Sequence, residues 1–245
     1  MEIKDRIINY WTQRSESFAK LRHEELHSYM SDLWLAEILK YLPPKPCKIL
    51  DVGTGSGFFA QLLAKYDHEV DGIDLTQSMI EQANLSLKQY SNYNSKINFQ
   101  VMDAENLAYA DNTFDVVISR NLTWTLPHPQ KAYQEWYRVL KPNGILLNFD
   151  ADYGNEQFYQ QSSVNHKLPP NHAHLKVQPQ LMQECDLIKN SLEISHKLRP
   201  QWDLRILKQL NFQKISVDTT LGQRIYKFQD KFYNPAPVFL IYATK

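Results

Sequence analysis

Cysteine is scarce in this chain. Only two of its 245 residues are cysteines, Cys47 and Cys185, and they lie far apart in the sequence. This excludes a disulfide framework or a zinc site built on paired cysteines, so an apolar core must hold the fold together. Such low cysteine usage is typical of a reducing compartment, and we expect a cytoplasmic protein.

Long apolar runs are also missing. The longest unbroken apolar segments are far shorter than the roughly 20 residues that span a bilayer. The N-terminal Met-Glu-Ile-Lys-Asp-Arg is charged and lacks the apolar core of a signal peptide. We therefore expect no membrane partner.

Neither sign of charge is in excess. Lys and Arg together number 27, as do Asp and Glu, so no general basic field exists to hold a phosphate backbone. We expect no nucleic-acid partner and favour a small molecule. Apolar residues make up 43% of the chain, enough for a core. A monomer and a homodimer both stay open.

The order of expected elements indicates an α/β protein. Two helices are expected within residues 3–41. Pro43 and Pro44 end the second helix, because proline prevents its continuation. Strands are expected at 48–52, 69–74, 97–102, 114–119 and 145–149, with helices at 58–66, 76–90 and 130–140. This alternation favours right-handed βαβ units and a parallel sheet.

The second half of the chain departs from this rhythm. Residues 151–176 are rich in Asn, Gln, His, Ser and Pro, and we expect a loop or lid there. Helices are expected at 180–192 and 202–210, and strands at 212–219 and 238–244.

The strongest local signal is Asp51-Val-Gly53-Thr-Gly55-Ser-Gly57, which ends a strand and opens a helix. Glycines let the backbone turn tightly and approach a ligand, and the helix N-terminus adds free amide donors. Ligands of doubly wound sheets bind at this end of the strands. A dinucleotide fingerprint, G-x-G-x-x-G, would place its third glycine where Phe58 stands. A bulky aromatic there favours a cofactor without phosphates.

Two aspartates extend this signal. Asp74 closes the second strand, where a carboxylate can accept hydrogen bonds from both hydroxyls of a ribose. Asp103 follows the third strand, where a carboxylate can accept from an adenine amine while the amide of Ala104 reaches a ring nitrogen. Leu75 and Met79 are expected to offer apolar faces to the purine.

Five motifs in this order resemble class I S-adenosylmethionine-dependent methyltransferases of the small-molecule branch. The resemblance covers about residues 46–150 and implies an α/β, Rossmann-like seven-stranded sheet of order 3-2-1-4-5-7-6, with helices on both faces. The motifs are Leu50-Asp-Val-Gly-Thr-Gly-Ser-Gly57, Gly72-Ile-Asp74-Leu, Met102-Asp103-Ala-Glu, Phe114-Asp-Val-Val-Ile118 and Arg138-Val-Leu-Lys-Pro-Asn-Gly144.

With this resemblance the chain divides into four parts of one domain, 1–245. We expect an N-terminal helical cap at 1–45, a cofactor-binding core at 46–150, a lid or substrate insertion after the fifth strand at 151–205, and C-terminal strands at 206–245.

The resemblance also assigns cofactor-binding roles by position. It implies S-adenosyl-L-methionine as the cofactor, with its methionine part against the glycine loop and the N-terminal helices as a cap. The residues implied are Gly53, Thr54, Gly55 and Gly57 in the loop, Asp51 ordering it, Asp74 on the ribose, Asp103 and Ala104 on the adenine, Arg120 and Asn121 near the sulfonium, and Tyr10, Trp11 and Arg14 in the cap.

Two residues are candidates for the acceptor side. Trp124 follows the fourth strand, where an aromatic ring can wall a substrate pocket and attract a cation; a purely packing role is equally open. Asp150 ends the fifth strand and could act as a base from the sheet edge.

The histidines of the insertion do not follow the spacing of a metal site. His166, His172 and His174, with Cys185 further on, match no standard metal-ligand spacing. We therefore expect no metal, although one of these histidines could serve as a general base.

The implied reaction is in-line displacement of the methyl group, which yields S-adenosylhomocysteine. The donor is already activated, so alignment matters most and no catalytic dyad is expected. An NAD(P)-dependent oxidoreductase and a non-catalytic cofactor-binding regulatory protein stay open as alternatives. An RNA or protein methyltransferase is disfavoured, because Ser119-Arg-Asn-Leu-Thr-Trp124 replaces an Asn-Pro-Pro-Tyr type motif.

Overall fold

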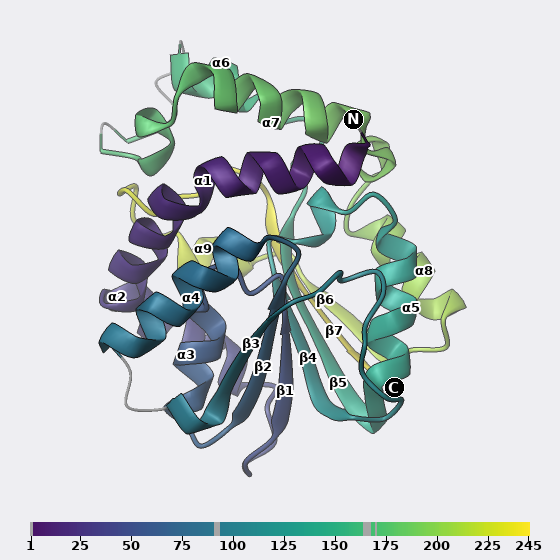
Figure 1. The fold of residues 1–245 in the computed structure, drawn as a ribbon. Helices are drawn as coiled ribbons and strands as arrows, with labels where there is room; N and C mark the ends of the chain where they lie inside the picture. Colours follow the sequence, from purple (N-terminus) through teal and green to yellow (C-terminus); the bar gives the residue numbers. More distant parts are fainter. Residues whose placement is uncertain (1, 91–93, 164–167, 170) are drawn as a thin grey trace.

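A seven-stranded sheet forms the centre of the protein. The computed structural model describes all residues except 1, 91–93, 164–167 and 170, and its strand order is β3-β2-β1-β4-β5-β7-β6 (Figure 1). β7 runs antiparallel to β5 and β6, and the other neighbours are parallel. The predicted sheet order is confirmed. The strands are β1 (Lys48–Val52), β2 (Glu69–Asp74), β3 (Ile97–Val101), β4 (Phe114–Arg120), β5 (Leu140–Ala151), β6 (Gln213–Asp218) and β7 (Val238–Thr244).

The central strands are apolar on both faces, which gives the molecule two cores. Ile49 and Leu50 are neighbours in β1, yet each is fully buried in a different core, because successive strand side chains point to opposite faces. One core is covered by α2 (Tyr29–Leu39), α3 (Phe58–Ala64) and α9 (Leu221–Ile225), the other by α5 (Pro129–Val139) and α8 (Gln201–Gln209). α4 (Gln77–Tyr90) packs along β2 and β3.

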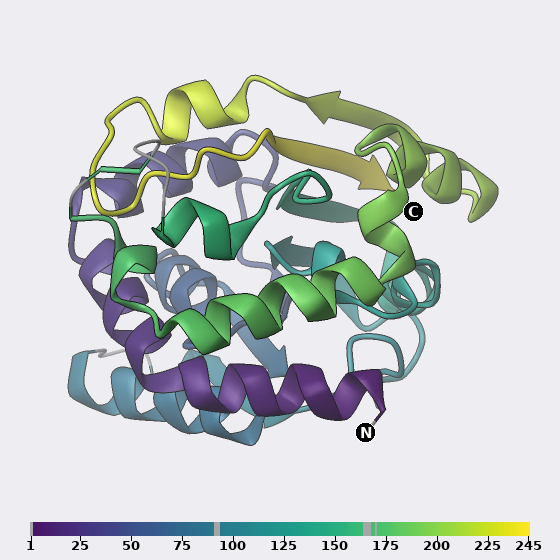
Figure 2. The same cartoon turned by 90° about the horizontal axis from the view of Figure 1, so that it is seen from above.

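A helical roof lies across the carboxyl ends of the strands. α1 (Ile3–Leu26) and α7 (Pro179–Ser191) run side by side there, with α6 (Phe158–Ser163) beside α7 (Figures 1 and 2). Arg6 of α1 donates to both carboxylate oxygens of Glu184 in α7, at 2.9 and 3.0 Å. Of the two predicted N-terminal helices, α1 therefore lies where it can cover a ligand at the sheet edge, whereas α2 packs over the core and contributes no residue to the cavity lining.

Three segments differ from the expected elements. Residues 151–176 contain α6 and the 3-10 turn η3 (Ala173–Lys176), and α9 was not predicted. Helices of five or six residues are too short to show helical periodicity in the sequence. β5 begins at Leu140 because this residue already pairs with Phe114 across a register shift. The remaining 3-10 turns are η1 (Asn94–Lys96), η2 (Thr123–Thr125) and η4 (Glu193–His196).

Neither a membrane span nor a metal cluster occurs in the described part of the chain. None of its helices is both long and apolar enough to cross a bilayer. No group of three His, Cys, Asp or Glu side chains there is arranged to hold a metal ion. His166 and the side chain of His174 lie outside the described residues.

Candidate active site

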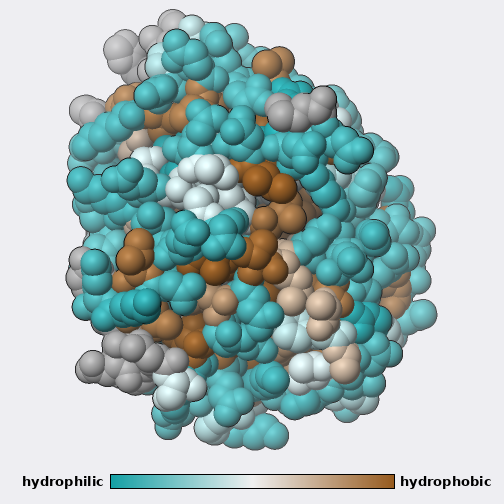
Figure 3. Space-filling view, in the orientation of Figure 1, coloured by the Kyte–Doolittle hydropathy of each residue, from teal (hydrophilic) through white to brown (hydrophobic). Residues whose placement is uncertain are grey.

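A large cavity lies between the helical roof and the carboxyl ends of β1, β2 and β4. Apolar side chains gather at a hollow below α1 on this face of the molecule (Figure 3), and several parts of the chain line the cavity. They include α1, Asp51 and the glycine loop at 53–55, Phe58 and Phe59 of α3, the strand ends at 74–76 and 102–105, Met79, residues 120–122 and 124–127, the insertion through Tyr153, Phe158, His172, Met182 and Cys185, and the C-terminal residues 226 and 231–236.

The glycine loop adopts the backbone that its sequence requires. Gly53, Gly55 and Gly57 have φ angles of +68°, +55° and +83°, in the left-handed region that disfavours other residues. A Cβ on Gly53 would come within 2.8 Å of Leu122, and one on Gly57 within 2.5 Å of the Phe99 ring. Gly53, Thr54 and Gly55 line the cavity, whereas Gly57 does not. Gly57 instead shapes the start of α3.

Asp51 is a buried carboxyl beneath this loop. It is 2% exposed and accepts a hydrogen bond from the Thr54 hydroxyl at 2.6 Å. Burial raises the pKa of Asp51 to about 7, although Thr54 and the Ala60 amide oppose the shift. Its contact with Thr54 agrees with the expected role of ordering the loop.

Asp74 connects the glycine loop to the end of β2. One carboxylate oxygen accepts from the Gly55 amide at 3.1 Å and the other from the Thr76 amide at 2.9 Å. Burial raises the pKa of Asp74, while these two amides favour its charged form. Leu75 and Met79 line the same wall of the cavity. The backbone thus fixes a carboxylate at the edge where a ribose was expected.

Asp103 is held by contacts from both sides. It accepts from the Glu105 amide at 2.9 Å and from the ammonium group of Lys4 at 2.7 Å. Lys4 also contacts the buried carboxylate of Glu105 at 2.6 Å. Ala104 lines the cavity beside Asp103. Lys4 was missed because nothing in its local sequence marks it as a partner of a strand end 99 residues away.

Arg120 reaches under the roof and pairs with a residue that sequence reasoning missed. Its guanidinium donates to the two carboxylate oxygens of Glu25 at 2.7 and 3.2 Å, and it stacks 4.2 Å from the centre of the Trp34 ring. Burial alone would raise the pKa of Glu25, but Arg120 and Arg22 outweigh it and keep that pKa below its ordinary value. Arg120 lines the cavity as expected, with its charge partly neutralised.

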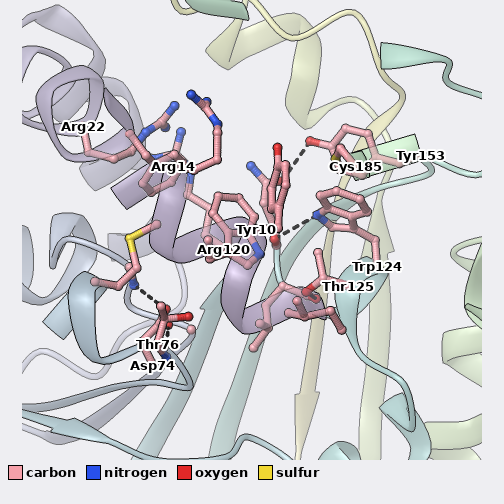
Figure 4. A pocket seen from close by; sticks show the side chains of 18 of the residues that line it. Tyr10, Arg14, Arg22, Asp74, Thr76, Arg120, Trp124, Thr125, Tyr153 and Cys185 are labelled. Carbon is pink, nitrogen blue, oxygen red and sulfur yellow. Dashed lines mark hydrogen bonds between the residues drawn. The ribbon is translucent and has the colours of Figure 1, made fainter. Parts of the chain in front are cut away.

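Trp124 forms an aromatic wall on the other side of the cavity. Its indole N–H donates to the Asn121 carbonyl at 2.9 Å, and its ring lies 4.7 Å from Tyr153 and 5.7 Å from Phe158. Asn121, at φ +54°, and Trp124 both line the cavity. Trp124 therefore packs and faces the cavity at once. Figure 4 shows it opposite Arg14 and Arg22.

The expected place of Asp150 in the acceptor pocket is wrong. Asp150 is fully buried and is absent from the cavity lining. It accepts from the Arg199 guanidinium at 3.0 Å, the Trp124 amide at 3.1 Å and the Thr123 hydroxyl. Strand alternation explains this, because Phe149 faces one core and the next side chain must face the opposite layer, where Arg199 lies. Asp150 supports Trp124 from below.

The roof contributes three of the expected residues. Tyr10, Trp11 and Arg14 all line the cavity from α1. The Trp11 ring packs edge-on between Tyr10 and Phe18, with centroid distances of 5.1 and 5.4 Å. Arg14 is only 7% exposed. The amphipathic spacing of α1 thus places one side of the helix in the cavity.

The C-terminal segment between α9 and β7 also closes the cavity, which the sequence did not reveal. Asn234 donates to the Tyr153 hydroxyl at 2.8 Å, and the Tyr233 carbonyl lies 2.7 Å from a ring nitrogen of His172. Burial lowers the pKa of His172. The segment expected to supply only strands therefore joins the insertion at the acceptor side.

Comparison with known proteins identifies the core of the chain. Residues 50–148 match the family model described as a methyltransferase domain. An uncharacterized methyltransferase of Bacillus subtilis is 28% identical over 162 residues, 65% of this chain and 61% of that protein. A ubiquinone biosynthesis O-methyltransferase of Coxiella burnetii is 33% identical over 99 residues, 40% of this chain and 41% of its own length.

Two further similarities cover different shares of the chain. Phosphoethanolamine N-methyltransferase 3 of Arabidopsis thaliana is 35% identical over 116 residues, 46% of this chain and 23% of that protein. The chain thus spans less than two thirds of the curated relatives it matches. A solved structure from Thermotoga maritima, described as an S-adenosylmethionine-dependent methyltransferase and possible histamine N-methyltransferase, covers 97% of this chain and 99% of its own, with a TM-score of 0.62 at 17% identity.

These findings confirm the predicted resemblance. Residues 50–148 match a methyltransferase domain, the chain has the Rossmann-like fold of solved S-adenosylmethionine-dependent methyltransferases, and S-adenosylmethionine is the cofactor of that family. Residues 50–148 therefore resemble a methyltransferase domain and not a dinucleotide-binding domain.

Proposed function

We propose that this protein transfers the methyl group of S-adenosylmethionine to a small-molecule acceptor in the cavity beneath α1. The observation that carries the proposal is the meeting of the glycine loop, Asp74 and Asp103 at one cavity wall. These three features come from the ends of β1, β2 and β3, where doubly wound sheets bind their ligands.

The residues of this wall fit the cofactor. Gly53 and Gly55 line the cavity at positions where a Cβ would crowd Leu122 and Phe18, and Asp74 is held with both oxygens at the cavity edge by backbone amides. Phe58 is 4% exposed and occupies the position that a pyrophosphate-binding loop keeps as glycine. We assign the ribose to Asp74 and the adenine to Asp103 and Ala104, between Leu75 and Met79.

The other residues of the glycine loop and the roof complete this assignment. We place the methionine part of the cofactor against Gly53, Thr54 and Gly55, on a loop that Asp51 and Gly57 shape. Asn121 and Arg120 lie at the end of β4 near the reacting centre. Trp11 and Arg14 cover the cavity from α1.

When bound, the cofactor supplies a methyl group on a positively charged sulfur. An acceptor N, O, S or C atom attacks the methyl carbon in line with the carbon–sulfur bond, which breaks to leave S-adenosylhomocysteine. The protein has to align the acceptor and exclude water. The helical roof excludes water, because α1 and α7 cover the strand ends (Figure 2). Trp124 and Tyr153 form a flat wall against which an acceptor can be oriented.

The acceptor class follows from the cavity and from the relatives. The cavity is enclosed by a roof and lined largely by aromatic and apolar side chains, which suits a small molecule better than a polymer. The Coxiella burnetii and Arabidopsis thaliana proteins are named for ubiquinone biosynthesis and phosphoethanolamine. These names agree on small molecules and differ in the acceptor.

Binding followed by turnover tests the proposal. Isothermal titration of the purified chain with S-adenosylhomocysteine should show saturable binding, whereas NADH should not bind. Incubation with methyl-labelled S-adenosylmethionine and metabolite pools should then label a small molecule. Tight binding of NADH with no affinity for S-adenosylhomocysteine would support an oxidoreductase, and binding without any labelled product would support a regulatory protein.

A further inference from the structure

The charged side chains of the cavity are unevenly distributed. Asp74 and Thr76 lie at one edge, while Arg14 and Arg22 reach in from α1 higher on the same side (Figure 4). Trp124, Tyr153 and Cys185 lie on the opposite side, with Tyr10 between them and the two arginines. The cavity thus has an acidic edge, a basic region and an aromatic wall.

The basic region holds more positive charge than its own residues neutralise. Arg22 and Arg120 both form ion pairs with Glu25. Arg14 is 7% exposed, donates to the Ser17 hydroxyl at 2.7 Å, and forms no ion pair within the described residues. Arg22 and Arg120 therefore share one carboxylate and Arg14 has none, so that among these four side chains positive charge exceeds negative charge by two.

The guanidinium groups of this region are also incompletely hydrogen-bonded. The Nε atoms of Arg14, Arg22 and Arg120 are buried and have no hydrogen-bond partner among the described residues. Burial lowers the pKa of Arg22 despite Glu25, which means that its charge is incompletely compensated. Arginine does not lose its proton in proteins, and an uncompensated buried charge is costly. Anions bound in the cavity would remove this cost.

The carboxylate of the cofactor is one anionic group that this region can hold, while the ammonium and sulfonium groups of the cofactor leave the excess positive charge in place. Arg22 stacks on the Phe18 ring at 5.0 Å, and that ring lies against Gly55 of the glycine loop. Arg22 and its neighbour Arg120 are thus beside the place assigned to the methionine part, which carries one carboxylate. Arg14 lies two helical turns further along α1, next to Tyr10.

We propose that the methyl acceptor is itself an anion, a carboxylate or a phosphate ester, whose charged group is held by Arg14 and whose apolar part lies against Trp124 and Tyr153. This inference rests on the proposed function. It moves Arg14 from the cofactor, to which the family resemblance assigned it, to the acceptor. The planar guanidinium fork suits both carboxylate and phosphate oxygens.

The test measures acceptor binding to protein saturated with S-adenosylhomocysteine. The probes are benzoate, phenyl phosphate and the neutral benzamide. Glu156 also lines the cavity, so a comparison of anionic with neutral ligands measures directly whether the acceptor region favours negative charge. Isothermal titration should show at least one anion binding 10-fold or more tightly than benzamide, and the better anion distinguishes a carboxylate from a phosphate site.

Variants on a single helix locate the effect. Arg14→Gln should weaken the preferred anion at least 10-fold and leave benzamide and S-adenosylhomocysteine within threefold. Lys20→Gln, which removes a charge from the exposed side of α1, should change none of these affinities. Arg14→Lys, which keeps the charge without the fork, should retain part of the preference, and circular dichroism verifies folding.

Different failures have different meanings. Equal binding of benzamide and both anions overturns the inference while the proposed function stands. A loss of S-adenosylhomocysteine affinity in Arg14→Gln, with the anion preference intact, returns Arg14 to the cofactor and also overturns it. No binding of S-adenosylhomocysteine to the wild-type protein refutes the proposed function, and the inference falls with it.

Discussion

Replacing Asp51 with asparagine should stabilise the ligand-free protein more at pH 8 than at pH 5. The Asp51 carboxyl is 2% exposed, and burial raises its pKa from about 3.8 to about 7. The Thr54 hydroxyl, 2.6 Å away, recovers only part of the hydration that the carboxylate loses. Asparagine keeps an acceptor for this hydroxyl and carries no charge at either pH.

The sign and size of the effect follow from the two pKa values. Between about pH 4 and pH 7 the folded state binds more protons at Asp51 than the unfolded state, so stability falls as pH rises through this window. The penalty is about 2 kcal/mol at pH 5 and about 4 kcal/mol at pH 8. The variant should therefore gain about 2 kcal/mol on the wild type between the two pH values, or roughly 4–8 °C in Tm for a chain of this size.

Differential scanning calorimetry of both proteins at pH 5 and pH 8 measures this difference. Other titrating groups are common to both proteins and cancel, and the acceptor oxygen lost in Asp51→Asn changes stability equally at both pH values. A Tm difference between variant and wild type that is the same at pH 5 and pH 8 would refute the assignment of a raised pKa to Asp51. Such a cost at a ligand-binding loop is typical of a residue kept for function.

Three further predictions concern the cofactor edge, the buried ion network and the aromatic wall. Asp74→Ala should weaken S-adenosylhomocysteine binding by about 10- to 100-fold by calorimetry, because hydrogen bonds to a charged group are worth about 1.5–3 kcal/mol; unchanged affinity would remove Asp74 from the site. Arg199→Met should lower the free energy of unfolding by about 3–5 kcal/mol in urea titrations, since it leaves Asp150 and Asp203 buried without their shared cation; a loss below 1 kcal/mol would contradict this. Trp124→Ala should reduce turnover of the acceptor found by labelling at least 10-fold while S-adenosylhomocysteine affinity stays within threefold, and an equal loss of both would make Trp124 a packing residue only.

Local patterns in the sequence carried the prediction of the fold a long way. The strands at 48–52, 69–74 and 238–244 occur where expected, and the sheet order implied by the motifs is the one observed. These elements could be predicted because strand and helix periodicities, and the φ angles that only glycine adopts easily, are properties of neighbouring residues. The short helices α6 and α9 gave no such signal.

For the side chains of the candidate site, some positions could be predicted from the sequence and others could not. Asp74, the last residue of β2, and Asp103, which comes shortly after β3, line the cavity as expected, since parallel strands bring their ends to one edge. Asp150 lies within β5, next to its last residue, and the alternation of side chains turns it into the buried layer beneath Trp124. A shift of one residue along the strand decides between those two outcomes.

The sequence by itself determined the strands, the glycine loop and the carboxylates at the strand ends, because each depends on spacing within a short stretch of chain, and the family resemblance of its motifs implied the order of the sheet. Only the tertiary structure decided the partners: Lys4 with Asp103, and Arg120 with Glu25, are 99 and 95 residues apart. It also placed Arg14 in a region where positive charge exceeds negative. Electrostatic contacts depend on distance in space, and the folded chain alone sets that distance.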